Sequence, residues 1–588
     1  MVLAAVLAAG GLLPGLAVAG GKSHTVASDA SVEITVTPWI DNMPKQGMTP
    51  VAVRIVNRAP QERAWEFVAK QTDYRAGEMS GHFAMRVPAG GTASGTFLIN
   101  VLPDSESSGR GYKNVNISVV GPSVPFGMGV YLTTSSSGSS GSSSSAKWSP
   151  FIGVSEQFDQ AHRKAFKGVV EDQMHLQWQG DTVSMAQAPL DWRGYTSLAQ
   201  LWLMDSEWNG LSEAQRQTML TWVGAGGNVC MVVPSPETLP TLPQGLEWKD
   251  GLRHGAGSIT LVPSFKIGES ISSNVKALSN KSEVTSKRDK GQERLFELVP
   301  PLTLRGKLIF SFILIFGVMV GPVNLFYFAR GNNRPRLFWT TPLISFTGAA
   351  VLVAVMFLQD GTGGTGARVL LATMLPQQKQ MVVLQEQYSK TGVLLGRSFD
   401  LPEHESTWLM PIPTVRVVKA RYGGTEERQE KRNYAQDDIH ASGGWFASRA
   451  LQSQLLQSVR LNRGGIDLKE GANPTVISSL ASPLSHLYVM DSKQQMWVAE
   501  KVPVGQSIPL KQVSRDQFNN WLQSSAQVNM GDLMRSRMEA GIPASGPWFF
   551  AQAAEPAKLA IPTLNSIRWE HDRAYITGPV TIDSAAAK

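Results

Sequence analysis

Cysteine is almost absent from this chain, since Cys230 is the only one in 588 residues. A single thiol cannot form an intramolecular disulfide, which excludes a small secreted fold held by disulfides, so the folded regions must depend on packing. The nine histidines show no His-x-x-x-His spacing and no pairing with cysteine, and neither a Gly-x-Ser-x-Gly motif nor a phosphate-binding loop occurs. The sequence therefore offers no catalytic constellation. We expect no catalytic, cofactor-binding or metal-binding residues and no cofactor.

Asp, Glu, Lys, Arg and His are missing from two long apolar runs, at 308–329 and 337–358. A helix needs about 20 residues to cross the roughly 30 Å hydrocarbon core, and each run is long enough. The connector at 331–337 is too short to cross back, so the runs predict a transmembrane hairpin with both large flanking regions on one side. Spans without ionisable residues also argue against a proton relay or an ion path built from this chain alone.

Acidic residues are absent from the turn between the runs, which carries Arg330, Arg334 and Arg336. An excess of Lys and Arg in a short loop marks the cytoplasmic side of a membrane. Residues 1–20 agree with this orientation, because they are apolar and end in Ala17-Val18-Ala19, a pattern typical of signal peptidase sites. No Lys or Arg precedes the apolar stretch, which departs from the usual form. We expect a signal peptide at 1–20, cleaved or kept as an anchor, that places the regions flanking the hairpin outside the cytoplasm.

Small residues inside the two runs suggest how the helices pack. Such residues at an interface let transmembrane helices approach closely. They are Gly317 and Gly321 in the first run, and Ser345, Gly348 and Ala349 in the second. We expect these residues to serve packing within the hairpin, and contact with the helices of a partner is the alternative.

The first exported region alternates apolar and polar residues from 31 to 120, as in Val32, Ile34 and Val36. Period-two alternation predicts strands buried on one face, and several such strands separated by turn residues predict an immunoglobulin-like β-sandwich at 25–133. The Ser- and Gly-rich segment 134–147 has too few apolar residues to pack and predicts a flexible linker.

The pattern changes at 148–264. Apolar runs at 151–154, 198–204 and 229–233 predict buried strands, and the capping-box sequence Ser212-x-x-Gln215 begins a helix between the last two. Strand, helix and strand within about 35 residues form a β-α-β unit, so we predict parallel strands in an α/β domain.

The region after the hairpin, 367–588, reads mostly as strands, with a probable hairpin turn at 491–495. Helical spacing occurs at 443–459 and 515–527. We therefore expect a β-rich extracytoplasmic domain with a few helices.

Three features invite a chemical interpretation, and each has a structural one that we favour. Gly361-x-Gly363-x-x-Gly366 matches the dinucleotide-binding motif, yet it follows an apolar run rather than a strand, so we expect a flexible connector. Cys230 lies inside a continuing strand instead of a sharp elbow, which favours a buried structural thiol. The densest candidate for metal ligands, Glu403-His404-Glu405, follows Pro402 in a predicted turn, and we expect a surface loop there.

The net charge of +7 does not indicate a nucleic-acid partner. The basic residues are scattered, and the densest charged stretch, 426–432, mixes Glu with Arg and Lys, as solvated faces do. We expect no nucleic-acid binding.

Several segments carry a resemblance to a known group of proteins. They are Leu190-Asp191-Trp192-Arg193-Gly194-Tyr195, the segments 201–205 and 222–227, Gly321-Pro322-Val323-Asn324 and Pro342. The arrangement resembles poorly characterised bacterial membrane proteins that have an exported, degenerate glutamine-amidotransferase-like domain followed by a transmembrane helix pair. The likeness covers roughly 148–358, and the Ser-rich linker is not typical of the group. It implies an α/β domain without the amidotransferase nucleophile and, by similarity, a role like that of auxiliary components of ABC-type exporters. No catalytic residue carries over.

Taken together, these features predict a multidomain membrane protein with a β-sandwich, an α/β domain, a two-helix hairpin and a β-rich C-terminal domain. We expect a non-enzymatic protein of the bacterial inner (cytoplasmic) membrane that presents binding domains outside the cytoplasm. It would contact the lipid bilayer and other membrane or envelope proteins, as an accessory or scaffold subunit of a transport or envelope-assembly complex. One alternative is an exported hydrolase or amidotransferase-like enzyme that uses the α/β domain. Another is half of a pore that oligomerisation closes.

Overall fold

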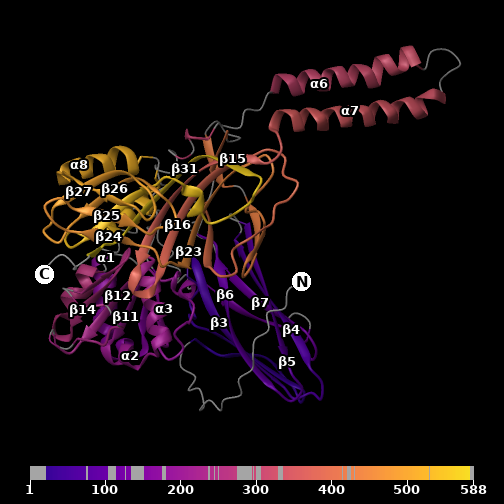
Figure 1. The fold of residues 1–588 in the computed structure, drawn as a ribbon. Coiled ribbons are helices and arrows are strands. Elements are labelled where there is room, and N and C mark those ends of the chain that lie inside the picture. The colour runs from indigo at the N-terminus through magenta and orange to yellow at the C-terminus, as the bar shows by residue number, and fades with distance from the viewer. Residues whose placement is uncertain are drawn as a thin grey trace.

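The computed structural model describes residues 21–582 with gaps, the longest at 104–113, 134–150, 175–179, 275–294, 300–305, 329–334 and 420–424. The architecture is multidomain and strongly β-rich, with several sheets and two apolar helices that project from a β-rich body (Figure 1). The predicted signal peptide at 1–20, the predicted linker at 134–147, Arg330 and Arg334 lie outside the described residues.

The first part of the chain contributes strands to two sheets. Strands β1 (His24–Ser28), β2 (Val32–Pro38), β3 (Gly47–Asn57) and β6 (Thr92–Val101) pair antiparallel in a four-stranded sheet. Strands β4 (Arg63–Asp73), β5 (Gly77–Val87), β7 (Asn114–Val120) and β8 (Gly129–Thr133) lie in a seven-stranded sheet. The alternation seen in the sequence has its predicted effect, because Val32, Ile34 and Val36 are fully buried on one face of β2.

Three strands from the C-terminal half complete the seven-stranded sheet. They are β17 (Phe399–Asp400), β21 (Arg432–Asp437) and β22 (His440–Gly443). Strand β21 pairs parallel with β5, with Arg432 opposite Gly77. The absence of a Cβ at Gly77, whose φ is +113°, lets the backbone of Arg432 approach closely. The predicted C-terminal domain 367–588 is therefore not a separate unit, because apolar alternation identifies a strand but not its partner.

The segment 151–263 forms a six-stranded sheet in the order β10-β9-β11-β12-β14-β13. Its strands are β9 (Ile152–Ser155), β10 (Gly180–Val183), β11 (Gln200–Met204), β12 (Asn228–Val233), β13 (Leu252–His254) and β14 (Gly257–Pro263), and its helices are α1 (Glu156–Met174), α2 (Asp205–Gly210) and α3 (Glu213–Gly224). All neighbouring strands are parallel except β13. The predicted parallel strands and the predicted start of a helix at Ser212 are confirmed, since the Ser212 side chain accepts a hydrogen bond from the Gln215 N–H.

The C-terminal half is built on a nine-stranded sheet in the order β18-β23-β16-β15-β31-β30-β26-β27-β29. These strands are β15 (Gly364–Leu375), β16 (Gln380–Thr391), β18 (Ser406–Ile412), β23 (Leu451–Leu461), β26 (Leu484–Met490), β27 (Met496–Val502), β29 (Lys511–Val513), β30 (Trp548–Ala553) and β31 (Ile567–Pro579). Two smaller sheets hold β24 (Ile466–Lys469), β25 (Thr475–Ser478), β28 (Ser507–Pro509) and β32 (Thr581–Ile582), and the hairpin β19 (Val415–Lys419) and β20 (Thr425–Gln429). Asp491 accepts the N–H groups of Lys493 and Gln495 in the predicted turn between β26 and β27.

The two helices expected in this region have different outcomes. The prediction at 515–527 is confirmed by α8 (Arg515–Trp521) and the π-helical turn Leu522–Ala526, and α9 (Asp532–Gly541) follows. The prediction at 443–459 is wrong, because β23 occupies most of it. Both faces of β23 are buried, so its apolar and polar residues do not alternate with a period of two. Buried glutamines on the strand, such as Gln454, have hydrogen-bond partners inside the protein.

The body is held together by hydrophobic clusters that cross the boundaries between its sheets. One cluster joins Trp39, which follows β2, and Met48 of β3 to Trp222 of α3 and to Leu375 of β15. Another joins Met79 of β5 to the nine-stranded sheet. The segments before and after the apolar helices therefore fold as one interlocked body.

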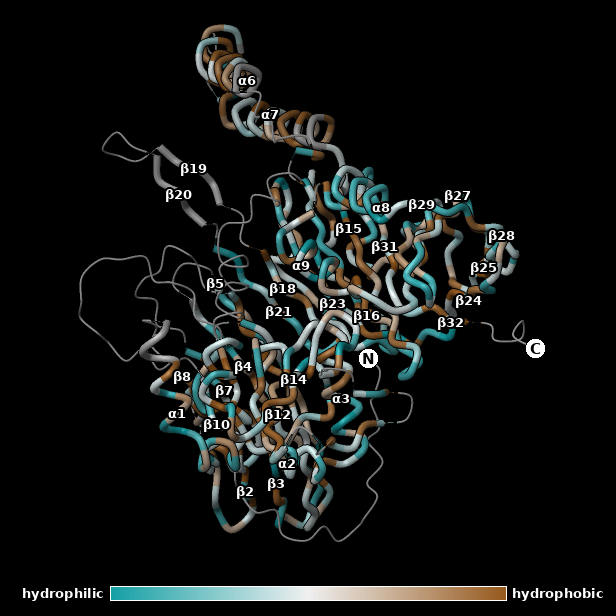
Figure 2. Tube along the Cα trace, turned by 90° about the vertical axis from the view of Figure 1, so that its left-hand side faces the viewer, coloured by the Kyte–Doolittle hydropathy of each residue, from teal (hydrophilic) through white to brown (hydrophobic). Residues whose placement is uncertain are grey.

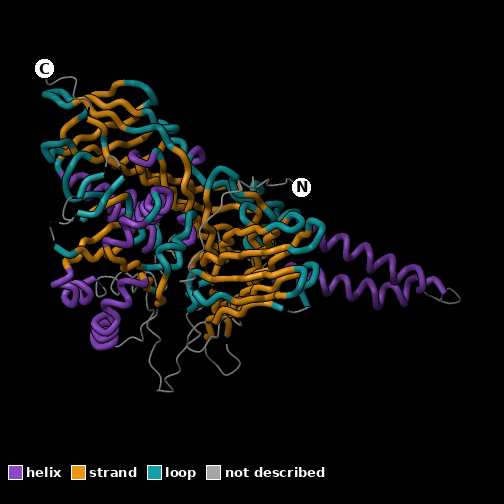
Figure 3. The backbone as a smooth tube through the Cα atoms, turned by 90° about the horizontal axis from the view of Figure 1, so that it is seen from below, coloured by secondary structure: helices purple, strands orange, loops and turns teal. Residues whose placement is uncertain are grey.

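The apolar helices are α6 (Gly306–Val318), which continues as the π-helical segment Met319–Phe328, and α7 (Leu337–Asp360). They lie side by side and extend away from the body in Figures 1 and 3, and brown, hydrophobic segments occur in both helices in Figure 2. Both are long and apolar enough to cross a membrane, with 6% and 0% of their apolar windows buried. The π-helical segment contains Pro322, which lacks the N–H of a regular helical turn.

The interlocked body fixes one aspect of topology. Strand β5 precedes α6 and strand β21 follows α7, and the two strands are hydrogen-bonded neighbours. A membrane crossed by α6 and α7 must therefore have both flanking regions on the same side.

Candidate functional site

The six-stranded sheet reverses its strand order between β9 and β11. From β9 the chain passes through α1 to β10 on one side, and β11, β12 and β14 then extend the sheet on the other. In open α/β sheets, ligands bind outside the carboxyl ends of the strands at such a reversal. Ser155 ends β9, and Glu207 lies in α2, directly after β11.

Glu207 fills this position with a carboxylate of the chain itself. Its Oε1 accepts the N–H of Gln157 at 3.1 Å, and its Oε2 accepts the N–H of Met204 at 3.0 Å and the hydroxyl of Ser155. Ser155 is 0% and Glu207 9% exposed. Gln157 lies in the first turn of α1, where free N–H groups and the helix dipole favour an anion. Glu207 thus takes the place of an anionic ligand.

Two exposed polar side chains next to this contact are bonded to each other. Ser206 Oγ donates to Gln157 Oε1 at 2.8 Å, and both residues are exposed. The Ser155 hydroxyl and the N–H groups of Gln157 and Met204 all donate to Glu207, so they are not free to bind a ligand. The geometry suits a locked structural contact rather than a ligand cradle.

Cys230 lies on the neighbouring strand β12, opposite Trp202, and is 1% exposed. The prediction of a buried thiol within a strand is confirmed. Gln200 Nε2 donates to its sulfur at 3.0 Å, and burial raises the pKa of the thiol. Burial keeps the sulfur in its neutral thiol form and keeps solvent and substrates away from it. Both effects disfavour a nucleophilic thiolate.

The residues of Glu403-His404-Glu405 do not form a ligand set, although His404 Nε2 lies 3.9 Å from Glu405 Oε1. The His404 side chain is 83% exposed, whereas that of Glu405 is 7% exposed and accepts the Ser458 hydroxyl at 2.7 Å. Arg460 lies 3.5 Å from the same carboxylate and forms an ion pair with it. Within the described part of the chain, no group of three His, Cys, Asp or Glu side chains could hold a metal ion.

The Gly361-x-Gly363-x-x-Gly366 segment is an ordered joint, so the predicted flexible connector is wrong. Gly361 ends α7 with a φ of +69° and donates its N–H to the Phe357 carbonyl at 3.0 Å. Gly363 has a φ of +82°, and a Cβ there would overlap the Ser566 carbonyl oxygen. Gly366 is already in β15, and a Cβ there would lie 2.6 Å from the ring of Trp569. The three glycines serve a helix end, a tight turn and a close packing contact.

Backbone hydrogen bonds tie this joint to the body. Val393 donates its N–H to Gly361 O at 3.0 Å and accepts the N–H of Gly363 at 3.1 Å, and Gly364 N–H bonds to Ser566 O at 3.0 Å. Helix α7 therefore enters an interior strand of the nine-stranded sheet through three fixed residues.

A buried ion pair clamps the same strand. Arg368 of β15 binds Asp572 of β31 through two hydrogen bonds of 2.9 and 2.5 Å, with side chains 8% and 17% exposed. The guanidinium also stacks on Trp569 at 5.2 Å. Sequence reasoning missed this pair, because 204 positions separate its members and no motif links them.

The helix hairpin has its own polar contact. Asn324 is 1% exposed, donates to Thr341 Oγ1 at 2.8 Å and accepts the Thr340 hydroxyl at 2.6 Å. These bonds join α7 to the π-helical segment that follows α6, and polar side chains often link transmembrane helices in this way.

The small residues of the hairpin divide into two groups. Gly348 lies against Phe316, since a Cβ there would be 2.5 Å from the ring. A Cβ at Gly317 or Gly321 would meet nothing within 4 Å. The prediction that Gly317 and Gly321 let the two helices pack together is therefore wrong, and their side of the helix stays open.

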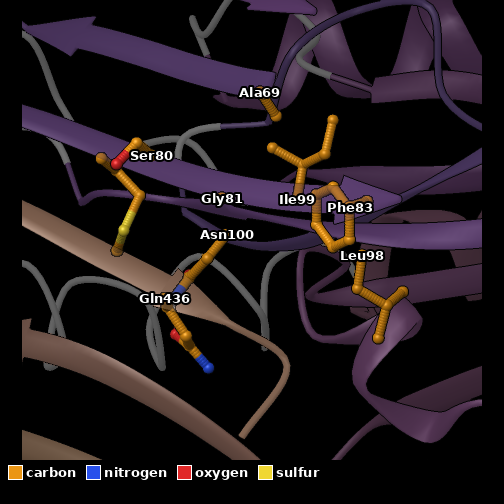
Figure 4. Close-up of a pocket in the computed structure, with 9 residues that line it drawn as sticks. Ala69, Ser80, Gly81, Phe83, Leu98, Ile99, Asn100 and Gln436 are labelled. Atoms are coloured by element: carbon orange, nitrogen blue, oxygen red, sulfur yellow. Dashed lines mark hydrogen bonds between the residues drawn. The ribbon is translucent and has the colours of Figure 1, made fainter. Parts of the chain in front are cut away.

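A small cavity lies between β5, β6 and β21 (Figure 4). Asn100 Nδ2 donates to Gln436 Oε1 at 2.9 Å on its wall. The lining residues are Ala69, Met79, Ser80, Gly81, Phe83, Leu98, Ile99, Asn100 and Gln436. Its volume of about 10 Å³ suits a single water molecule, and Gln436 Nε2 has no hydrogen-bond partner among the residues that the structure describes. The cavity is too small for an organic ligand.

Comparisons with known proteins leave the function open. No family model and no curated protein matches the chain. Among solved structures, a cycloisomaltooligosaccharide glucanotransferase from Paenibacillus sp. shares 12% identity over 37% of this chain and 28% of that one, with a TM-score of 0.16. A Bacteroides uniformis β-glucuronidase shares 8% over 36% and 24%, with a TM-score of 0.14. A β-D-mannosidase from Dictyoglomus thermophilum shares 6% over 85% and 76%, also with a TM-score of 0.14. The chain spans less than half of the first two proteins, and scores this low support neither a shared fold nor a shared activity.

Proposed function

We propose that this chain is a non-enzymatic bacterial envelope membrane protein, which serves as an accessory or scaffold subunit of a transport or envelope-assembly complex. The hairpin α6–α7 crosses the inner membrane, and the body lies outside the cytoplasm. In this proposal residues 25–133 are an immunoglobulin-like sandwich, which borrows three strands from the C-terminal half. Residues 148–264 are a degenerate glutamine-amidotransferase-like domain.

The observation that carries the proposal is the joint between α7 and β15. Its hydrogen bonds at Gly361, Gly363 and Gly364 and the Arg368–Asp572 clamp leave no loose segment between helix and sheet. A membrane helix attached in this way holds the body at a set orientation and passes a displacement of the helix directly to the sheet. A subunit that links a membrane partner to an extracytoplasmic assembly needs this property.

The α/β unit supports the non-enzymatic part of the proposal. Glu207 occupies the position where such sheets bind ligands, and the only cysteine is 1% exposed with a raised pKa. The alternative of an exported hydrolase or amidotransferase-like enzyme needs an accessible nucleophile. Reaction of Cys230 with a small alkylating agent in the folded protein would favour that alternative, and we expect reaction only after unfolding.

The outer surface of the hairpin supports the subunit role. Large apolar side chains such as Phe326 and Phe346 are 72% and 75% exposed, and the positions of Gly317 and Gly321 are open. Lipid covers such surfaces in an isolated hairpin, and small residues also admit a second helix.

The proposal is tested by crosslinking in native membranes before extraction. A photoreactive residue at Phe346 reports partners beside the hairpin, and one at Leu190, which is 69% exposed on the body, reports extracytoplasmic partners. We expect the same protein to crosslink and to co-purify after mild detergent extraction. The variant Gly317→Leu adds bulk on the open side of α6, and it should lower the amount of partner that co-purifies but leave the body folded. A chain that runs alone and crosslinks only to lipid at both positions would contradict the proposal.

A further inference from the structure

The loop 392–398, between β16 and β17, lies beside the point where α7 ends. Val393 is hydrogen-bonded through both its N–H and its carbonyl to the joint residues Gly361 and Gly363, and Gly392 N–H bonds to Gly363 O at 2.7 Å. Leu395 is two residues further along the chain. The loop is therefore fixed next to the last turn of the helix.

The loop has an apolar tip on a firm base. Leu394 and Phe399 are 8% and 7% exposed and pack into the main hydrophobic core, and Leu394 N–H bonds to Ser448 Oγ at 3.0 Å. Between them, Leu395 is 88% exposed and is followed by the exposed residues Gly396, Arg397 and Ser398. The buried neighbours hold Leu395 out of the body, so its exposure is built into the loop.

The length of α7 sets the height of this loop relative to a bilayer. Its 24 residues extend about 36 Å at 1.5 Å per residue, which exceeds the roughly 30 Å hydrocarbon core. Leu358, in the last turn, is 86% exposed and belongs to the apolar surface of the helix. The end of α7 thus reaches the headgroup layer, and the loop bonded to Gly361 lies at the same level.

The charge beside the tip suits a phospholipid surface. Arg397 is exposed, and Arg449, also exposed, donates its N–H to Gly392 O at 2.8 Å. An aliphatic side chain with basic neighbours matches the bilayer interface, where the apolar group enters the acyl boundary and the cation meets phosphate.

We propose that loop 392–398 is a second membrane contact, in which Leu395 enters the interface of the outer leaflet and Arg397 binds lipid phosphate. The loop and α7 together fix the tilt of the body over the bilayer. This inference rests on the proposed membrane anchoring by α6 and α7, with which the contact is continuous.

The test uses fluorescent labels on single cysteines in the full chain, reconstituted into nanodiscs of phosphatidylcholine and phosphatidylglycerol. Native Cys230 is 1% exposed, and the unsubstituted protein measures its background labelling. The variants are Leu395→Cys at the loop, Phe346→Cys within α7 and Leu461→Cys as the matched control. Leu461 is 80% exposed at the other end of the sheet, since it pairs with Gln380 whereas Leu451 pairs with Lys390 beside the loop. Ten residues of strand separate the two ends by about 33 Å.

Spin-labelled lipids should quench the labels at 346 and 395, with the label at 395 quenched most by a spin label near the headgroup, and should leave 461 unquenched. Adding Arg397→Gln to L395C should reduce the quenching at 395, and unchanged quenching would remove Arg397 from the contact. If the label at position 346 is quenched but the label at position 395 is quenched no more than the one at position 461, the loop proposal fails and the membrane anchoring stands. If 346 is not quenched, the anchoring itself fails.

Discussion

The α6–α7 hairpin and the α/β unit are both rich in apolar residues, yet they expose them to opposite degrees. The apolar windows of the hairpin are 6% and 0% buried, whereas every residue of β12 after Asn228 is buried. Each region contains a buried polar side chain that bridges two elements: Asn324 in the hairpin and Glu207 in the α/β unit. The α/β unit buries its apolar residues within the body, whereas the hairpin leaves them exposed, as the membrane anchoring proposed above requires.

The two bridging side chains fit this difference. Glu207 accepts three hydrogen bonds at the start of α1, so both of its buried oxygens have partners within the protein. Asn324 is a neutral amide whose partners are threonine hydroxyls, which avoids placing a charge in hydrocarbon. The predictions below test each side of the comparison.

The largest effect is expected for Glu207→Ala. The substitution leaves the Ser155 hydroxyl and the N–H groups of Gln157 and Met204 without their buried acceptor, at a cost of about 3 kcal/mol. Thermal unfolding of the full chain in detergent should show a clear fall in Tm. Glu213→Ala is the control, because the Glu213 side chain is 61% exposed and its loss should change little. Equal Tm values for the two variants would mean that Glu207 does not lock the strand ends.

Leu343→Arg tests the hairpin. Leu343 of α7 is 65% exposed, and an arginine within a transmembrane helix costs about 2.5–3.5 kcal/mol for insertion. The fraction of the chain that resists alkaline extraction from membranes should fall. Leu461→Arg, at an 80% exposed position of the body, should leave that fraction unchanged. Equal fractions of membrane-bound chain for the two variants would show that the hairpin tolerates a charge as well as the body does.

Asn324→Leu should weaken the hairpin by about 1–2 kcal/mol, because two interhelical hydrogen bonds are lost in an apolar medium. A double-mutant cycle with Thr340→Val, read from the stability of the hairpin in detergent, isolates the pair. The two changes together should cost less than the sum of their separate effects. Strict additivity would show that Asn324 and Thr340 are not coupled.

The smallest effect concerns Asp181, which accepts the N–H groups of Asp41, Asn42 and Thr182. Burial raises the pKa of this carboxyl, and the nearby Asp41 adds to the rise, against the opposing backbone hydrogen bonds. A raised pKa favours the protonated form in the folded state, so the stability it contributes is present at low pH and is lost as pH rises through that pKa.

Asp181→Asn removes the charge and keeps an oxygen acceptor. The Tm of the variant should therefore rise relative to that of the unsubstituted protein as the pH increases. Parallel Tm profiles across the acid range would show that burial of this carboxylate carries no cost.

The comparison also explains which parts of the fold could be predicted from the sequence. The strands at 151–154, 198–204 and 229–233 and the helix after Ser212 form from local signals, and the apolar runs are recognised by length alone. Pairing of β5 with β21 left no local signal, since contacts such as His82 with Asp437 span 355 positions. Strand β23 was misread as a helix because it is buried on both faces and shows no alternation.

The candidate site was less accessible to sequence reasoning than the fold. Ser155 and Glu207 match no motif, although both directly follow predicted strands, and the rule that ligands bind at the carboxyl ends of parallel strands could have singled them out. The glycines of the joint were read as flexible because composition does not show which carbonyl a glycine must approach. The Arg368–Asp572 clamp could only come from the structure.

The central claim is that both halves of the chain share one side of the membrane, outside the cytoplasm. Labelling of Leu190→Cys and Leu461→Cys with a membrane-impermeant maleimide in intact spheroplasts tests it directly, since these positions are 69% and 80% exposed in the two halves and Cys230 is buried. We predict rapid labelling of both variants and none of the unsubstituted protein. Labelling of either variant only after the membrane is disrupted would contradict the account.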